Sequence, residues 1–162
     1  MIIHYMQDRD RALPLSPIPR KNWEIDAYPV NEIAEYVQDV SQRDIDVLVE
    51  EYYNKYDMIL DGRDPEEFKE HVAVQAGIEI GFERFLEEKK YQAIVTHFGD
   101  LGSLEQLPGL AIQRLMEKGY GFGGEGDWKT AAMGIEVVYI DGDTTIRNLQ
   151  NELRWNSMYF SK

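Results

Sequence analysis

The chain of 162 residues contains no cysteine, which excludes disulfide bonds, thiolate metal sites and a thiol nucleophile, and fits a reducing compartment. Basic residues are scarce: 17 Lys and Arg stand against 30 Asp and Glu, giving a formal net charge of −13. Polyanions repel such a chain, so we predict no nucleic acid and no membrane as partners. No apolar run reaches the roughly 18 residues of a membrane span, and the first residues do not resemble a signal peptide. These features predict a cytoplasmic protein.

One domain is the expectation for this length, because 162 residues with 43% hydrophobic content can bury one core but are few for two. Three of the six prolines lie at positions 14, 17 and 19. Proline pushes the residue before it toward extended geometry and cannot continue a hydrogen-bonded element. We therefore predict that residues 1–20 form an irregular arm.

Hydrophobic spacing predicts helices alternating with a few buried strands. Apolar residues recur at helical intervals in five segments, and two short runs rich in β-branched residues are typical of buried strands. Such an alternation favours an α/β architecture, with a small layered sheet and flanking helices. The predicted helices are 30–38, 42–57, 65–89, 108–118 and 144–154, and the predicted strands are 92–98 and 135–140.

Local signals accompany the predicted helices. Ser41 with Asp44 three residues later resembles a capping box, and Asp64 followed by Pro65 is typical of a helix start. Gly77 and Gly81 lie inside the longest predicted helix, where each costs about 1 kcal/mol relative to alanine. We therefore predict a closely packed neighbour at these glycines.

Residues 120–129 combine four glycines with two carboxylates, Glu125 and Asp127. Gly121, Gly123 and Gly126 satisfy the pattern G-x-G-x-x-G, with Asp141 twenty residues after the first of them. That dinucleotide fingerprint needs a preceding strand and a following crossover helix. Here a predicted helix precedes it, and only two helical turns fit before the strand at 135–140. The spacing therefore favours a glycine-rich turn with solvated carboxylates.

Two carboxylates can bind a divalent cation or act as acid and base, but a metal site needs further ligands. His97, at the end of a predicted strand, is a candidate third ligand, although a hydrogen-bonded histidine at the edge of the core is the more ordinary interpretation. His71 lies among charged neighbours and is predicted to be a surface residue.

Six blocks of the sequence keep a distinctive order of residue types: 30–41, 81–87, 107–116, 119–132, 135–141 and 144–156. Together they closely resemble the L-arabinose isomerase family. Residues 21–133 are similar to the central domain of these enzymes, which resembles that of L-fucose isomerases, and residues 134–162 are similar to the extreme C-terminus. These two parts are far apart in the family, so the chain resembles a shortened isomerase joined near Met133 and Gly134.

The resemblance implies an aldose–ketose isomerase that converts L-arabinose to L-ribulose through a cis-enediol, with Mn²⁺ as cofactor. It implies that Glu125 is both metal ligand and proton carrier, that Asp127 binds the sugar and that Phe98 lines the sugar pocket. It also implies a homo-oligomer. Since the central domain of the family packs on parts missing here, we expect apolar surface of the longest helix or of residues 110–116 to stay exposed or to self-associate.

The sequence also departs from the family. The second metal-binding glutamate and both ligand histidines of the family belong to segments without a counterpart here. The family sequence Phe-Glu-Asp-Leu-His-Gly appears as Phe-Gly-Asp-Leu-Gly-Ser at residues 98–103. Two interpretations follow. Either Glu125 and a divalent metal completed by other groups carry the isomerisation, or the chain is a non-catalytic remnant or oligomerisation module.

Overall fold

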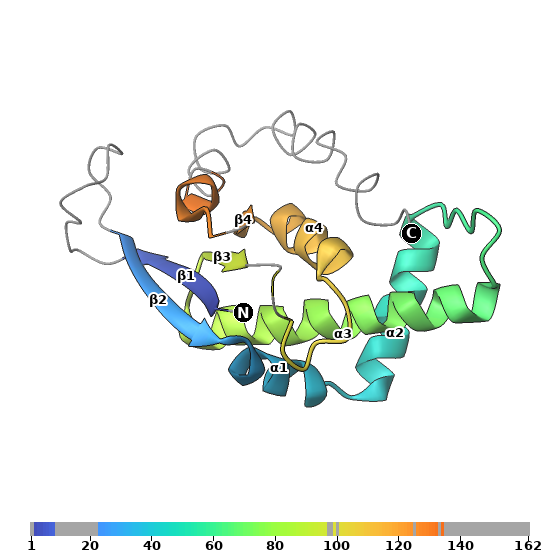
Figure 1. Cartoon of the computed structure of the whole chain (residues 1–162). Coiled ribbons are helices and arrows are strands. Elements are labelled where there is room, and N and C mark those ends of the chain that lie inside the picture. Colours follow the sequence, from blue (N-terminus) through green and yellow to red (C-terminus); the bar gives the residue numbers. More distant parts are fainter. Residues whose placement is uncertain are drawn as a thin grey trace.

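Four strands form one sheet in the computed structural model (Figure 1), which describes residues 2–8, 23–96, 99, 101–124, 126–132 and 134. The strands are β1 (Ile2–Asp8), β2 (Trp23–Pro29), β3 (Ala93–Thr96) and β4 (Gly121–Gly124). Their order is β2-β1-β3-β4. β1 is antiparallel to both of its neighbours, whereas β3 and β4 are parallel. The predicted α/β class is confirmed.

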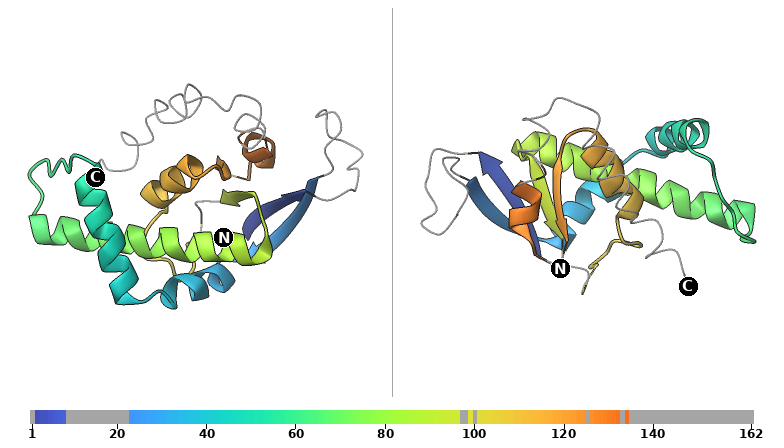
Figure 2. Two further views of the ribbon diagram at one scale, coloured as in Figure 1. Left: turned by 180° about the vertical axis from the view of Figure 1, so that it is seen from behind. Right: turned by 90° about the horizontal axis from the view of Figure 1, so that it is seen from above.

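Four helices accompany the sheet in the described part of the chain: α1 (Val30–Gln38), α2 (Gln42–Lys55), α3 (Pro65–Lys89) and α4 (Gly109–Glu117). α3 passes beneath the sheet and continues well beyond it (Figure 2). In the part beyond the sheet, α2 packs across α3. Residues 128–132 add a short helical segment after β4. Within the described ranges, no helix combines the length and the apolarity needed to span a bilayer.

The predicted start signals are present. The Ser41 hydroxyl accepts the N–H of Asp44 at 3.2 Å, which caps α2. Asp64 accepts the N–H groups of Glu66 and Glu67, which caps α3. α4 has no cap of its own, but the Gln75 side chain reaches it from α3. The Gln75 amide oxygen accepts the N–H of Leu110 at 3.2 Å, so α3 fixes where α4 begins.

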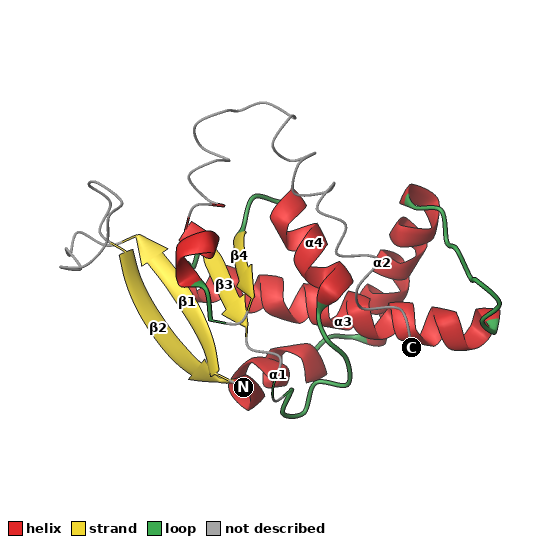
Figure 3. Cartoon of the chain, turned by 45° about the horizontal axis from the view of Figure 1, so that its top comes forward, coloured by secondary structure: helices red, strands yellow, loops and turns green. Residues whose placement is uncertain are grey.

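The core lies on both faces of β3. Ile94 packs with the large cluster between the sheet and α1, α3 and α4. Ala93 and Val95 pack against Ala131 and Ala132 on the opposite face, where the short helical segment covers the sheet (Figure 3). Burial on both faces explains why Ala93, Ile94 and Val95 are all apolar rather than alternating with polar residues.

Of the two glycines of α3, Gly81 has the closely packed neighbour that was predicted, whereas Gly77 meets a side chain at ordinary van der Waals distance. A Cβ built on Gly81 would lie 2.7 Å from the backbone N and Cα of Val37 in α1. A Cβ on Gly77 would lie 3.5 Å from the Cδ1 atom of Ile45 in α2. Gly81 therefore permits the crossing of α1 and α3, and Gly77 faces the start of α2.

The structure departs from the predicted fold in three places. Residues 1–20 are not irregular throughout, because Ile2–Asp8 form β1; the prolines lie beyond this strand and do not interrupt it. Strands β2 and β4 were not predicted, although Ile25 and Tyr28 of β2 pack on opposite faces of the sheet. The expected exposure of apolar surface on α3 or residues 110–116 is not found for the large side chains Phe82, Phe85 and Leu115, which have no exposed surface because α1, α2 and α4 cover α3. The alternative, self-association, stays a prediction.

The predicted elements at 135–140 and 144–154, and the segment boundary at 134, lie outside the described residues or at their limit. The division of the chain into 1–20, 21–133 and 134–162 stays a prediction.

Candidate functional site

The carboxyl ends of β3 and β4 form the edge of the sheet where a ligand site is expected, because α/β folds bind ligands outside the carboxyl ends of their parallel strands. Thr96 and Gly124, the last residues of the two strands, pair directly. The Gly126 N–H then donates to the Thr96 carbonyl oxygen at 3.3 Å, which joins the chain after β4 to the end of β3.

The glycines at this edge allow the backbone to turn tightly after β4. A Cβ on Gly123 would collide with the carbonyl oxygen of Asp127, and Gly126 has a φ of +85°, a conformation that favours glycine. The Asp127 N–H donates to the Gly124 carbonyl oxygen at 3.0 Å. Because Gly121 and Gly123 lie within β4, they do not form the phosphate-binding turn of a dinucleotide site. The predicted glycine-rich turn is present only at Gly126 and Asp127, because Gly121, Gly123 and Gly124 lie in strand β4, which was not predicted.

Asp127 begins the short helical segment and is exposed to solvent. Its Oδ2 accepts the Thr130 hydroxyl at 2.6 Å, and its Oδ1 accepts the Thr130 N–H at 3.1 Å. Both hydrogen bonds lower the pKa of the Asp127 carboxyl, and the bond from the Thr130 hydroxyl has the larger effect. The side chain is therefore an ionised helix cap whose remaining lone pairs face water.

The other predicted site residues, Glu125 and Phe98, lie outside the described residues, as does His97. Among the residues that the structure describes, no three His, Asp or Glu side chains cluster so as to hold a metal ion. Thr96 is fully buried, and its hydroxyl has no hydrogen-bond partner in the described part of the chain. The structure thus describes the edge of the predicted site and one of its carboxylates.

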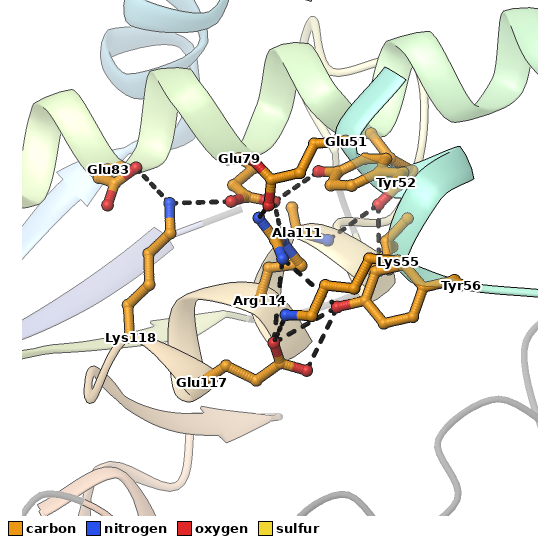
Figure 4. Close-up of polar contacts among 12 residues, drawn as sticks. Glu51, Tyr52, Lys55, Tyr56, Glu79, Glu83, Ala111, Arg114, Glu117 and Lys118 are labelled. Carbon is orange, nitrogen blue, oxygen red and sulfur yellow. Dashed lines mark hydrogen bonds and ion pairs between the residues drawn. The ribbon is translucent and has the colours of Figure 1, made fainter. Parts of the chain in front are cut away.

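A second polar cluster was not predicted from the sequence, and it is buried between α2, α3 and α4 (Figure 4). Glu79 in α3 has no exposed surface. Its Oε2 accepts the Tyr52 hydroxyl at 2.5 Å and the Arg114 Nε–H at 3.2 Å. Its Oε1 lies 2.9 Å from the Lys118 Nζ. One buried carboxylate therefore joins three helices, with Lys118 directly following α4.

Outer carboxylates complete the pairing of the two cations. Arg114 also contacts Glu51, at 2.5 Å, and Lys118 contacts Glu83 at 2.6 Å. Burial lowers the pKa of Arg114 and of Lys118, but hydrogen bonds to their partners and the charge of Glu79 outweigh it, so both pKa values are raised. The pKa of Tyr52 is raised mainly by burial and, to a smaller extent, by the charge of Glu79. Arg114, Lys118 and Tyr52 therefore stay protonated at neutral pH.

This buried cluster stabilises the helices and has no access to a substrate, because Glu79 is fully enclosed. A signal for it was present in the sequence. Glu79 interrupts the apolar stripe of the longest helix, and Arg114 interrupts that of residues 110–116. Charges at core-facing positions are costly unless they are paired, so each one indicated a partner on a neighbouring element.

Comparison with known proteins gives a consistent result. The family model of the L-arabinose isomerase central domain matches residues 19–142. The L-arabinose isomerase of Geobacillus kaustophilus is 45% identical over 124 residues, which cover 76% of this chain and 25% of that protein. The corresponding enzyme of Anoxybacillus flavithermus is 47% identical over 124 residues, with the same coverage of 76% and 25%. The L-arabinose isomerase 1 of Clostridium acetobutylicum is 47% identical over 111 residues, covering 68% and 23%. The chain thus spans about a quarter of the length of these relatives.

Proposed function

The chain belongs to the L-arabinose isomerase family, and from this membership we propose that the edge at the carboxyl ends of β3 and β4 contributes to the conversion of L-arabinose to L-ribulose. One observation carries the proposal: Thr96 and Gly124 pair as the last residues of two parallel strands. The sequence continues from these residues to Phe98 and Glu125. The glycines that follow bring the Asp127 backbone to the same edge.

The proposed chemistry is a proton transfer between adjacent carbons. The Glu125 carboxylate takes the proton from C2 of the aldose and returns it to C1, while the proton of the C2 hydroxyl passes to the C1 oxygen. The intermediate is a cis-enediol. A carboxylate suits this role because it can carry one proton for the duration of the step. Phe98 lines the sugar, and Asp127 uses lone pairs that Thr130 leaves free to accept a sugar hydroxyl.

The described residues do not form the Mn²⁺ site that the family implies. They contain no cluster of three ligands, and the hydrogen bonds from Thr130 leave Asp127 one further lone pair on each oxygen. We assign no step of the reaction to a metal. Glu125 is the residue that we propose as a Mn²⁺ ligand, and one carboxylate holds such a cation weakly because water supplies most of its coordination.

An isomerase assay on the full chain tests the proposed reaction. We expect slow formation of L-ribulose from L-arabinose in millimolar Mn²⁺, lost in Glu125→Gln and retained in Glu105→Gln. Glu105 is an exposed loop carboxylate, which makes it a matched control. Absence of product from the unmodified chain, or equal rates in the Glu125→Gln variant, would reject catalysis through Glu125. Either outcome would favour the non-catalytic interpretation.

A thermal-shift titration tests metal binding separately from activity. Metal at a hundred times its Kd stabilises a fold by about 2.7 kcal/mol. With one assigned ligand, we expect no shift at micromolar Mn²⁺ and a small shift at millimolar Mn²⁺, abolished by Glu125→Gln. A shift of several degrees at micromolar Mn²⁺ would show that other groups complete the site.

A further inference from the structure

The central position of β1 in the sheet is the starting point. β1 pairs with β2 over its whole length, from Ile2 opposite Pro29 to Asp8 opposite Trp23. On its other side, His4, Tyr5 and Met6 pair with Val95, Ile94 and Ala93 of β3. β1 therefore uses the backbone groups of both of its edges, and it lies between two strands that come later in the sequence (Figure 3).

The strand comes from outside the family domain. The family model matches residues 19–142, which include β2, β3 and β4 but not Ile2–Asp8. Among the described strands of the matched segment, β2 pairs with neither of the others, and β3 pairs with β4 alone. The described part of the matched segment by itself thus leaves a gap one strand wide between β2 and β3. Adjacent strands lie about 4.8 Å apart, so β2 and β3 are separated by about twice that distance.

The two walls of this gap are held in place by contacts that do not involve β1. The Tyr91 hydroxyl, two residues before β3, donates to Asp26 of β2 at 2.7 Å. The hydroxyls of Tyr28 and Tyr91 lie 2.6 Å apart. The Tyr28 ring also packs on Phe85 of α3, with ring centroids 5.2 Å apart. Side chains of α3, β2 and the residues before β3 therefore fix the spacing of the walls.

We propose that the gap between β2 and β3 is a strand-acceptor site, and that its occupant is this chain's own N-terminal segment, Ile2–Asp8. The edges of β2 and β3 that face each other use their backbone N–H and C=O groups to pair with β1, and such edges recognise an extended segment that runs antiparallel to them. The main chain supplies most of the recognition. Such a site binds a separate peptide of the same sequence once the covalent link to β1 is cut.

The experiment keeps the full chain and cuts it after folding. A protease recognition sequence is inserted between Leu13 and Pro14, outside the described residues, and the folded protein is cleaved. We expect the N-terminal piece to co-elute with the remainder in gel filtration and to exchange with a labelled peptide of residues 1–10. Release of the piece from a remainder that does not bind the peptide would overturn the proposal.

Peptide variants distinguish strand pairing from other binding. A peptide with Tyr5→Pro lacks one backbone N–H in the middle of β1, so we expect it to bind roughly tenfold more weakly or worse. A peptide with Tyr5→Thr keeps that N–H and a residue that favours strands, and we expect it to bind within about threefold of the parent. Equal binding of the Tyr5→Pro peptide would overturn strand addition.

A disulfide measurement covers the case in which the cleaved protein unfolds. Because the chain has no cysteine, the pair Met6→Cys and Ala93→Cys can be introduced without competing thiols. These residues are direct cross-strand partners, a separation close to that of a disulfide. We expect an intramolecular crosslink in this variant and none in the out-of-register control Asp8→Cys with Ala93→Cys. No crosslink, or a crosslinked dimer in which a second copy donates the strand, would overturn the assignment of the occupant.

Discussion

Asp127 caps the short helical segment and keeps lone pairs that face water. Its hydrogen bonds from Thr130 favour the charged carboxylate, so the folded state lowers its pKa. A group with a depressed folded pKa stabilises the protein above its unfolded pKa, about 3.9 for aspartate, and loses that contribution as the pH falls through the folded value. The cap is thus complete at neutral pH and lost in acid.

We predict that Thr130→Val raises the Asp127 pKa toward the ordinary aspartate value, because it removes the hydroxyl that donates at 2.6 Å. Thr130→Ser keeps a hydroxyl and should leave the pKa lowered. An NMR titration of the Asp127 carboxyl carbon measures both variants. An identical pKa in the valine and serine variants would show that the hydroxyl does not set it.

Glu79 carries the second prediction at this scale. It is fully buried and faces Arg114 and Lys118. Removing one partner of a buried ion pair costs about 3–5 kcal/mol when the other charge is left uncompensated. Because Arg114 and Lys118 keep Glu51 and Glu83 as partners, we predict a smaller loss in the free energy of unfolding for Glu79→Leu, about 1–3 kcal/mol, measured by urea denaturation.

The control for this prediction is Glu51→Gln, which changes an outer partner of Arg114. The Glu51 side chain is 54% exposed, and exposed ion pairs contribute about 1 kcal/mol or less. If Glu79→Leu costs no more than Glu51→Gln, the buried cluster does not stabilise the junction of the three helices.

At the scale of elements, α3 organises the molecule because every other long helix packs on it. Its two glycines have different neighbours. At Gly81 the backbone of α1 leaves no room for a Cβ, whereas at Gly77 the nearest atom belongs to a flexible isoleucine side chain at an ordinary contact distance. The same substitution should therefore have opposite effects at the two positions.

We predict that Gly81→Ala destabilises the protein by about 1–3 kcal/mol, since overpacking forces α1 away from α3. Gly77→Ala should stabilise it by about 0.5–1 kcal/mol, because alanine is the better helix former. Thermal and urea denaturation of the two variants, which differ by one helical turn in position, measure both effects. Destabilisation by both variants would show that α2 also needs the glycine.

At the scale of the whole molecule, assembly into a homo-oligomer, implied by the family resemblance, stays a proposal. The described surface that could support it differs from the surface expected from the sequence. Large exposed apolar side chains occur at Val47, Tyr53 and Ile59, with 62%, 41% and 76% exposure. They lie on α2 and in the segment after it. The net charge of −13 opposes the association of two copies.

We predict that self-association, if carried by this surface, strengthens with salt, because the Debye length falls from about 10 Å at 0.1 M to about 3 Å at 1 M. The double variant Val47→Ser with Ile59→Ser should weaken it, and Gln38→Ser, an exposed change on α1, should not. Sedimentation velocity at several concentrations is the measurement. A monomer under all conditions would contradict the proposal.

Much of the helical framework was predictable from the sequence, because it depends on neighbours in the chain. The capping residues Ser41 and Asp64, the apolar stripes of α2 and α3 and the run that forms β3 each carry their signal within a few residues. The need for a close neighbour at Gly81 was equally local, since glycine inside a helix is unfavourable without one. Family membership was also readable, because residues 107–116 and 119–132 keep a distinctive order of residue types.

Only the tertiary structure decided which distant segments meet. The central position of β1 depends on backbone pairing with β2 and β3, and backbone hydrogen bonds leave almost no sequence signal. The partners of Glu79 come from helices far apart in the chain, so its sequence position indicated a partner without identifying it. The return of the backbone at Gly123 and Gly126 depends on contact with Asp127, which the glycine spacing alone left open. Helix caps and apolar stripes depend on residues that are neighbours in the sequence, so the sequence predicts them. The pairing of distant segments depends on contacts that exist only once the chain has folded.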